Sequence, residues 1–150
     1  MNITIMCVGK LKEKYLKKSV EEYTKKIRKF ANINIIELED EKTPDSASYK
    51  EEILIKEKEG SNILRYIKDD MYVIAMDLNG KRIASEEFGK VINNLKIRGI
   101  NEVVFIIGGS LGLSKQVISR ADYKVCFSKM TFPHQLFRVM LLEQIYRSLF

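Results

Sequence analysis

Two short segments in the last third of the chain carry the residue types that could do chemistry. The first is FSKMTFPH at residues 127–134. Ser128 and Thr131 supply hydroxyls, Met130 and Phe132 supply apolar contact area, and the free N–H groups of the following helix point towards this loop. A ligand that combines a purine, a ribose and an amino-acid end needs that mixture. The alternative is a capped helix start whose Met and Phe side chains belong to the core.

The second segment is the glycine turn GGSLG at residues 108–112, which directly follows an apolar strand at residues 103–107. Glycine permits a positive φ and lets a ligand approach the backbone closely. Loops at the ends of parallel strands are also where open α/β sheets bind ligands. A plain tight turn would explain the same residues equally well. The spacing is not G-x-G-x-x-G and no Gly-Lys-Ser/Thr triplet occurs, which argues against a dinucleotide-binding oxidoreductase and excludes a P-loop.

Three charged or titratable side chains on the last helix are further candidates. His134 is the only histidine, and on the first turn of a helix it could orient a base or a ribose; a structural bond to a backbone carbonyl is the alternative. Arg138 lies one turn later, and Glu143 and Arg147 form an i,i+4 pair. Arginines on an otherwise apolar helix are costly unless they are paired or meet an anion.

The elements that must position these residues alternate along the chain. Apolar runs predict strands at residues 2–8, 33–39, 72–77, 103–107 and 124–127. Periodic and capped segments predict helices at residues 12–30, 48–67, 85–99, 114–121 and from 133 onward. This order predicts one α/β domain over residues 1–150, with a largely parallel sheet and helices on both faces. We expect a turn at residues 78–81 and an exposed helix face at residues 56–59.

Charge and composition restrict the class of protein. The chain has 150 residues and a net charge of +6, and nine Lys or Arg against three Glu at residues 10–29 account for that whole excess. The basic helix is either a solvated face or a surface for nucleic acid. Cys7 and Cys126 lie in apolar runs and indicate reduced core thiols. We expect a cytoplasmic protein with no metal site, no signal peptide and no contact with a membrane.

Four stretches together resemble one family: ITIMCVGKLKEKY, KEKEG, FIIGGSLGLS and FSKMTFPHQLFRVMLLEQIYR. They occur in order over nearly the whole chain and are similar to the RlmH-type (YbeA-like) branch of the SPOUT methyltransferases. The resemblance implies an S-adenosyl-L-methionine-dependent enzyme that methylates N3 of a pseudouridine in 23S ribosomal RNA of the large subunit, on the assembled ribosome. It also implies a homodimer and an α/β fold with a C-terminal trefoil knot.

The resemblance further assigns roles to individual residues. His134 would shape the pocket, and Arg138 and Arg147 would hold a phosphate or a developing oxyanion. Backbone-rich segments would hold the cofactor, and the residues concerned are Met76, Gly108, Phe127, Ser128, Lys129, Met130, Thr131 and Phe132. Met76 replaces the Leu that is frequent in the family, a swap that conserves volume. The last helix carries more apolar surface than one face needs, which independently favours a homodimer.

One departure from the family pattern affects the expected activity. Members of the family usually continue into a short tail that ends in a Pro-Tyr-His-like motif, whereas this sequence stops at Phe150. We expect the 150-residue chain to keep its fold and cofactor binding and to have weakened or lost methyl transfer. A non-catalytic ribosome-binding module that keeps the pocket is therefore an alternative function. A related SPOUT enzyme acting on tRNA is a further alternative, although no appended RNA-binding domain supports it.

Overall fold

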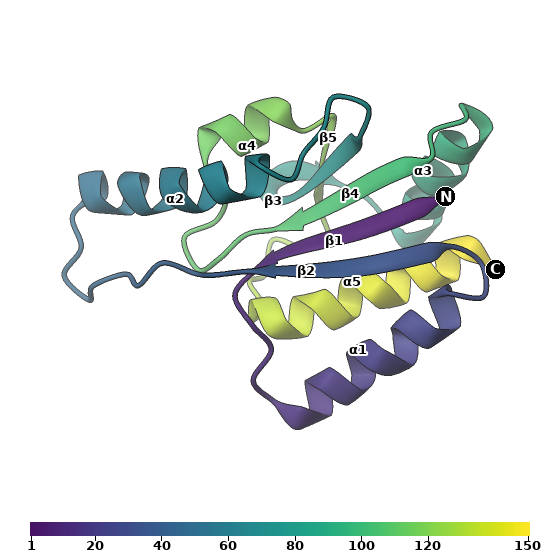
Figure 1. Ribbon diagram of the computed structural model, residues 1–150, viewed down its shortest axis with the longest axis horizontal. Helices are drawn as coiled ribbons and strands as arrows, with labels where there is room; N and C mark the ends of the chain where they lie inside the picture. The colour runs from purple at the N-terminus through teal and green to yellow at the C-terminus, as the bar shows by residue number, and fades with distance from the viewer.

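The computed structural model describes all 150 residues and contains one five-stranded sheet (Figure 1). The strands are β1 (Asn2–Val8), β2 (Asn32–Leu38), β3 (Tyr72–Arg82), β4 (Glu102–Ile107) and β5 (Tyr123–Cys126). Their order is β2-β1-β4-β3-β5, and all four pairings are parallel. The carboxyl ends of all strands therefore lie at one edge. The predicted α/β class with a largely parallel sheet is confirmed.

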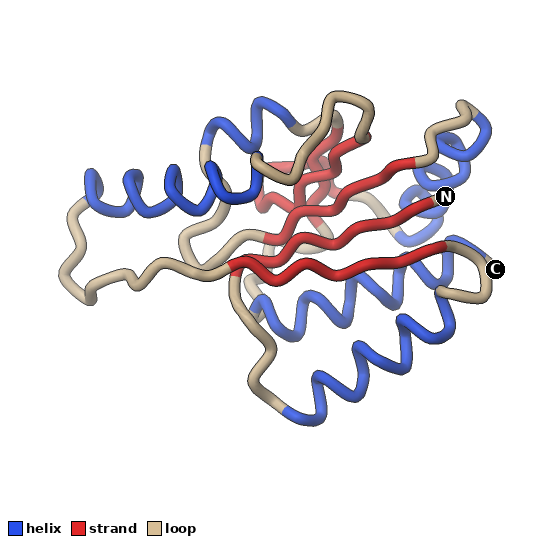
Figure 2. Tube along the Cα trace, viewed as in Figure 1, coloured by secondary structure: helices blue, strands red, loops and turns tan.

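Helices cover both faces of this sheet, as Figure 2 shows by placing the red strands between two groups of blue helices. The helices are α1 (Lys14–Ile27), α2 (Tyr49–Leu64), α3 (Ser85–Ile97), α4 (Lys115–Arg120) and α5 (His134–Leu149). The cluster with α1, α3 and α5 holds 20 buried residues, and the one with α2 and α4 holds eight. The three-helix face therefore provides most of the core. No helix has the length and apolar character that crossing a membrane requires.

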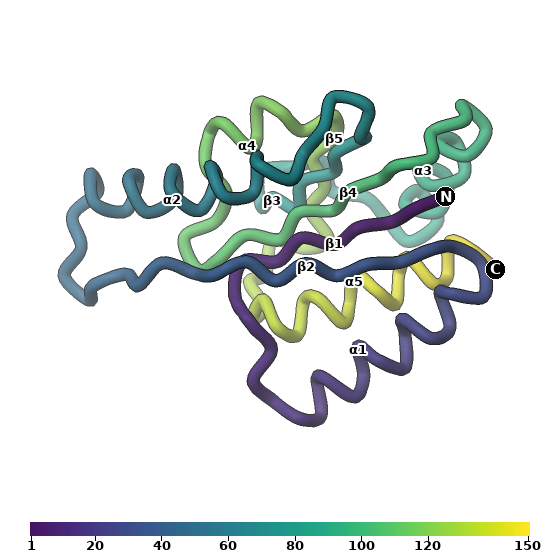
Figure 3. The backbone as a smooth tube through the Cα atoms, viewed as in Figure 1, coloured from purple at the N-terminus to yellow at the C-terminus, as the bar shows by residue number.

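The first and last helices of the chain pack side by side. Figure 3 shows the first strand, β1, in the middle of the sheet, with the last helix, α5, beside the first helix, α1. On β1, Ile3, Ile5 and Cys7 face the larger cluster while Met6 and Val8 face the smaller one. This alternation is the period of two that a strand imposes on its side chains. β4 is buried from Val103 to Ile107, as expected for a strand covered on both faces.

Strand β3 differs from the prediction. Residues 78–81 were predicted to form a turn after a strand ending at residue 77, but β3 continues to Arg82. Met76 and Lys81 are both paired with Val125, so residues 77–80 bulge out of the ladder. Gly80 fits there because a Cβ at that position would lie 2.7 Å from the backbone of Lys124 and Val125. The turn residues thus mark an excursion within a strand rather than its end.

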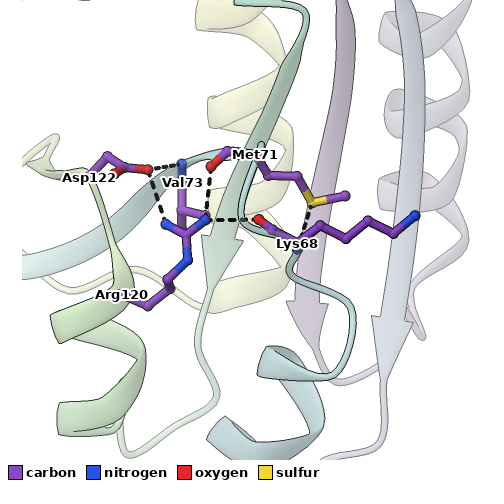
Figure 4. Close-up of polar contacts among 5 residues, drawn as sticks. All are labelled: Lys68, Met71, Val73, Arg120 and Asp122. Carbon is purple, nitrogen blue, oxygen red and sulfur yellow. Dashed lines mark hydrogen bonds and ion pairs between the residues drawn. The ribbon is translucent and has the colours of Figure 1, made fainter.

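At the amino ends of β3 and β5, one side chain connects several segments: Arg120 at the end of α4 (Figure 4). Its guanidinium donates to the carbonyl oxygens of Lys68 and Met71, both at 2.9 Å, and to Asp122 Oδ2 at 3.2 Å. The same Asp122 oxygen accepts from the Val73 N–H at 2.8 Å. Five residues at the start of β3 and β5 are thereby fixed together, far from the carboxyl ends of the strands.

Candidate functional site

A cavity of about 410 Å³ lies at the carboxyl ends of β3, β4 and β5. Three stretches of chain form most of its wall: residues 76–79 at the bulge of β3, residues 107–113 at the glycine turn, and residues 125–132 after β5. His134 and Phe137 of α5 and Lys56 of α2 complete the wall. The volume falls within the range of small-molecule sites, and the position is where open α/β sheets bind their ligands.

The glycine turn is folded tightly against itself. The Gly112 N–H donates to the Gly109 carbonyl oxygen at 3.1 Å, and Gly112 has a φ of +86°, which few other residues adopt. A Cβ on Gly108 would lie 2.9 Å from Leu113 Cδ2 and 3.0 Å from the Gly112 carbonyl. A side chain at position 108 would therefore force the turn open. Glycine keeps bare backbone at the cavity wall, which is the geometry that a ligand recognised by main-chain groups requires.

The loop after β5 is held by its own hydrogen bonds and by aromatic packing. Ser128 Oγ accepts from the Met130 N–H at 3.1 Å, and Cys126 Sγ lies 3.0 Å from the Ser128 carbonyl oxygen, to which it donates. The Phe127 ring packs edge-to-face against Phe88 and at a tilt against Phe137, with centroids 5.5 and 5.3 Å apart. Met130 is 71 % exposed, so the alternative that placed it in the core is wrong.

The predicted cofactor residues are largely brought together. Lys129 is exposed and is absent from the cavity wall. The seven others line the one cavity: Met76, Gly108, Phe127, Ser128, Met130, Thr131 and Phe132. They combine backbone groups, two hydroxyls and flat or flexible apolar side chains, which fits a nucleoside-type ligand with a small polar end. Asp77, Leu78 and Asn79 also line the cavity and add polar atoms, and no sequence pattern selected these residues.

The three predicted catalytic residues lie in different environments. His134 is the first residue of α5 and lines the cavity. Its neighbour Gln135 accepts from the Lys12 N–H at 3.2 Å, which ties the start of α1 to this wall. Arg147 lies 13 residues beyond His134 on the same helix, about 20 Å along its axis. There its Nε lies 2.6 Å from Glu143 Oε1, so this chain does not bring Arg147 to the cavity.

Arg138 is buried in an ion pair. Its Nη1 lies 2.6 Å from Glu37 Oε2 at the end of β2, and its Nη2 donates to the Gly9 carbonyl oxygen at 3.2 Å. Glu37 also accepts from the Leu11 N–H at 2.9 Å. Burial acts to raise the pKa of Glu37, but the hydrogen bonds from Arg138 and Leu11 outweigh it and the pKa is lowered. Burial raises the pKa of the nearby Cys7 thiol to about 11. Arg138 thus has a counter-ion inside the fold.

The prediction that residues 56–59 form only an exposed face is wrong. Lys56 lines the cavity, and Glu59 is 6 % exposed. Glu59 Oε2 accepts from the Glu41 N–H at 3.0 Å, and the other oxygen packs on the glycine turn, 3.3 Å from where a Cβ on Gly109 would be. Burial raises the pKa of Glu59, and the charges of Asp40 and Glu41 add to this effect against the hydrogen bond from the Glu41 N–H.

The next residue, Gly60, packs against Ser114, two residues after the glycine turn. A Cβ at Gly60 would lie 2.3 Å from Ser114 Oγ, so only a glycine lets Ser114 sit against α2. Ser114 Oγ in turn accepts from the Val117 N–H and caps α4. The sequence did contain a sign of this contact, because a glycine in the middle of a helix usually has a packing reason.

A larger hollow of about 620 Å³ lies elsewhere, between α1, α3 and α5. Its wall includes Tyr23, Phe88, Val139, Glu143 and Gln144. Helix side chains make up most of this wall, and it lacks the turns that present bare backbone at the strand ends. The smaller cavity is therefore the stronger candidate for binding a small molecule, and the larger hollow is a feature of the helical face.

Known proteins resemble this chain in sequence and in fold. The model of a family described as predicted SPOUT methyltransferase matches residues 1–150. A protein of Clostridium kluyveri named ribosomal RNA large subunit methyltransferase H is 64 % identical over 99 % of this chain and 93 % of its own length. A protein of the same name from Clostridium tetani is 66 % identical over the same shares. The crystal structure of a probable methyltransferase from Bordetella pertussis superposes with a TM-score of 0.51 at 11 % identity, covering 99 % of this chain and 96 % of that one, which shows a shared fold.

Proposed function

Because this chain belongs to the SPOUT methyltransferase family, we propose that it transfers a methyl group from S-adenosyl-L-methionine to ribosomal RNA of the large subunit. The names of its relatives support ribosomal RNA as the substrate class. The four stretches quoted above support a finer assignment, N3 of a pseudouridine on the assembled ribosome. Such a substrate is found in the cytoplasm, and we propose that location.

The observation that carries this proposal is the convergence of three separate stretches of chain on one cavity. Main-chain groups would bind the cofactor from residues 108–112 and 127–132, and Met76 would cover its base or ribose. Few charged side chains are needed for such recognition. The glycine at position 108 fits this role, because any side chain there would collide with the turn.

The cofactor supplies a methyl group that its sulfonium already activates, so the protein's main tasks are placement and exclusion of water. Half-buried Phe127, Phe132 and Phe137 make one side of the cavity apolar. A pseudouridine N3–H is a weak acid and must lose its proton near the transfer step. We propose that His134, in the cavity wall, shapes the site around that base.

Arg138 and Arg147 would serve the reaction in two different ways. Arg138 is already neutralised by Glu37, so its effect on the site would come through the position of α5. Arg147 is exposed beside Glu143, about 20 Å along the helix from His134. It would serve the reaction only if a second subunit carries it to a neighbouring cavity.

A homodimer would meet that condition, and the surface of α5 favours one. Phe150 is 72 % exposed and Leu136 is 39 % exposed, and several further apolar side chains of this helix are only half-buried. We expect sedimentation of a dimer at micromolar concentration. A monomer under those conditions would contradict the proposed assembly without affecting the cofactor site. The trefoil knot that the family resemblance implies stays a prediction.

Two measurements test the proposed function. Calorimetry should detect S-adenosyl-L-methionine binding with one site per chain, and Gly108→Val should abolish it while the matched change Gly89→Val, outside the cavity wall, should not. Methyl transfer from labelled cofactor should be specific to ribosomes that lack the modification. Absence of binding by the parent chain would contradict the cofactor site. Binding without transfer to any ribosomal RNA would contradict the enzyme assignment in favour of the non-catalytic ribosome-binding module.

A further inference from the structure

We infer that a row of lysines on the outer face of α1 holds the phosphate backbone of the RNA while the cavity takes the target nucleotide. This inference rests on the proposed function and names the docking surface for its substrate. The row consists of Lys14, Lys18 and Lys25, and Lys29 continues it in the turn after the helix. All four side chains are exposed.

The row lies opposite the side of α1 that packs on the protein. At 100° per residue, Lys14, Lys18 and Lys25 fall within about 40° of one another. The buried residues Leu16, Val20, Thr24 and Ile27 occupy the other side of the helix. From Lys14 to Lys25 the row extends about 16 Å along the axis. It is thus a straight line of cations that nothing within this chain covers.

The charge on this helix is not neutralised inside the protein. None of the four ion pairs in the structure includes a residue of α1. The two acidic residues of the helix, Glu21 and Glu22, lie in the gap between Lys18 and Lys25, each four residues from one of these lysines. They leave the two ends of the row, Lys14 and Lys29, without a carboxylate three or four residues away on the helix. Residues 14–29 contain seven Lys or Arg and two Glu, so the segment has a surplus of five positive charges.

The first half of the row works against the stability of the helix, whereas Lys25 lies in the last turn, where the helix dipole favours cations. Lys14 and Lys18 are an i,i+4 pair of like charges, which repel. Lys14 and Lys17 lie in the first turn, where the helix dipole favours anions, and that turn has no acidic residue. A bound polyanion would relieve both effects. RNA is the polyanion that the proposed reaction brings to this protein.

The row also begins near the cavity. The backbone of Lys12, two residues before α1, is bonded to Gln135, which follows the cavity residue His134. Figure 1 shows α1 and α5 side by side with both helices starting near the same end of the sheet. Lys56 adds positive charge in the cavity wall, and Lys129 is exposed in the loop whose other residues line the cavity. A backbone lying along α1 would therefore lead a strand of RNA towards the candidate site.

The test removes four charges in two different places. One variant carries Lys→Gln at positions 14, 18, 25 and 29, and the control carries Lys→Gln at positions 50, 90, 96 and 115, which are exposed on other helices and form no ion pair. Binding to ribosomes and to protein-free large-subunit RNA is measured as a function of salt. A third variant with Lys→Arg at the four row positions keeps the charge.

Loss of the row should weaken RNA binding about tenfold or more at low salt and reduce the slope of log K against log salt by about 3, while the control changes little. The Lys→Arg variant should bind like the parent. All variants should keep the parent's melting temperature and cofactor affinity. Equal losses in the row variant and the control would overturn the inference, as would loss of ribosome binding with intact binding to protein-free RNA, which would indicate a protein partner. Failure of the parent chain to methylate ribosomes would count against the proposed function alone.

Discussion

Two carboxylates lie near the carboxyl edge of the sheet, and the protein holds them in opposite ways. Glu37, at the end of β2, has a full counter-ion in Arg138 at 2.6 Å. Glu59, on α2, is more deeply buried, takes part in none of the four ion pairs, and has one hydrogen bond from the Glu41 N–H. The first carboxylate is therefore stabilised in its charged form, whereas burial works against the charge of the second.

Glu37 and Glu59 also contact different parts of the molecule. Arg138 connects α5 to the ends of β1 and β2 through Gly9 and Glu37. Those contacts fix the packing of the larger core and do not reach the cavity wall. Glu59 and Gly60 instead pack on Gly109 in the glycine turn and on Ser114, two residues after the turn. An ion pair made by a buried arginine thus supports the fold, while an unpaired buried carboxylate positions the site.

Breaking the ion pair should produce the largest effect. Glu37→Gln leaves the charge of Arg138, whose side chain is 4 % exposed, without a counter-ion, and we expect a loss of about 3 kcal/mol in the free energy of unfolding. Arg138→Met should cost less, because the Glu37 side chain is 34 % exposed and water can solvate it. Urea unfolding measures both. Glu22→Gln on the exposed face of α1 is the control, and a loss below about 1 kcal/mol for Glu37→Gln would contradict this account.

Disturbing the support of the glycine turn should have a smaller effect on stability and a specific effect on binding. Gly60→Ala places a Cβ 2.3 Å from Ser114 Oγ, and overpacking of this kind typically costs about 1–3 kcal/mol, partly offset by about 1 kcal/mol of helix propensity. We expect a net loss of about 1 kcal/mol in the free energy of unfolding, with S-adenosyl-L-methionine binding several-fold weaker because Ser114 and the turn move.

Gly89→Ala is the matched control for that substitution. It also replaces a glycine inside a helix, but the nearest atom to the new Cβ is Ser148 Oγ at 4.0 Å. This variant should be as stable as the parent or more so, and its calorimetric affinity for the cofactor should be unchanged. If both glycine variants bind the cofactor equally well, Gly60 has no special role in positioning the turn.

Local patterns predicted what depends on neighbouring residues. The apolar run of β1 gave its bounds, and the Ser48–Glu51 capping box that opens α2 is present in the structure. Helix α1 is shorter than the predicted 12–30, because the backbone leaves helical geometry at Glu13 and tightens after Arg28. Helix ends of this kind are set by the capping geometry, which periodicity alone does not locate.

Features that depend on distant partners could not be predicted. Glu59 belongs to a run of charged residues and is buried only because the glycine turn, some 50 positions later, packs on it. Arg138 finds its counter-ion 101 residues away. The bulge at residues 77–80 exists because β5 pairs with both sides of it. For the site itself, sequence patterns identified the segments that converge on the cavity. That α2 packs against the glycine turn became visible only in the structure.

The pH dependence of stability should distinguish the two carboxylates through the smallest of these effects. The pKa of Glu37 is lowered, so its contribution is present above its ordinary pKa and lost as pH falls. The pKa of Glu59 is raised, so the stability it contributes is present below its ordinary pKa and lost as pH rises through the folded-state value. The two groups should therefore give opposite slopes.

Urea unfolding of the parent, Glu37→Gln and Glu59→Gln between pH 3 and pH 7 measures those slopes, because each glutamine removes one titration and keeps the side-chain shape. Relative to the parent, Glu59→Gln should gain stability as pH rises, since the parent must then hold an unpaired carboxylate inside the fold. Glu37→Gln should instead become less stable relative to the parent as pH rises, because only the parent gains the charged pair. Parallel curves for the two variants would mean that the Glu41 N–H and local hydration stabilise the Glu59 carboxylate as well as Arg138 stabilises that of Glu37.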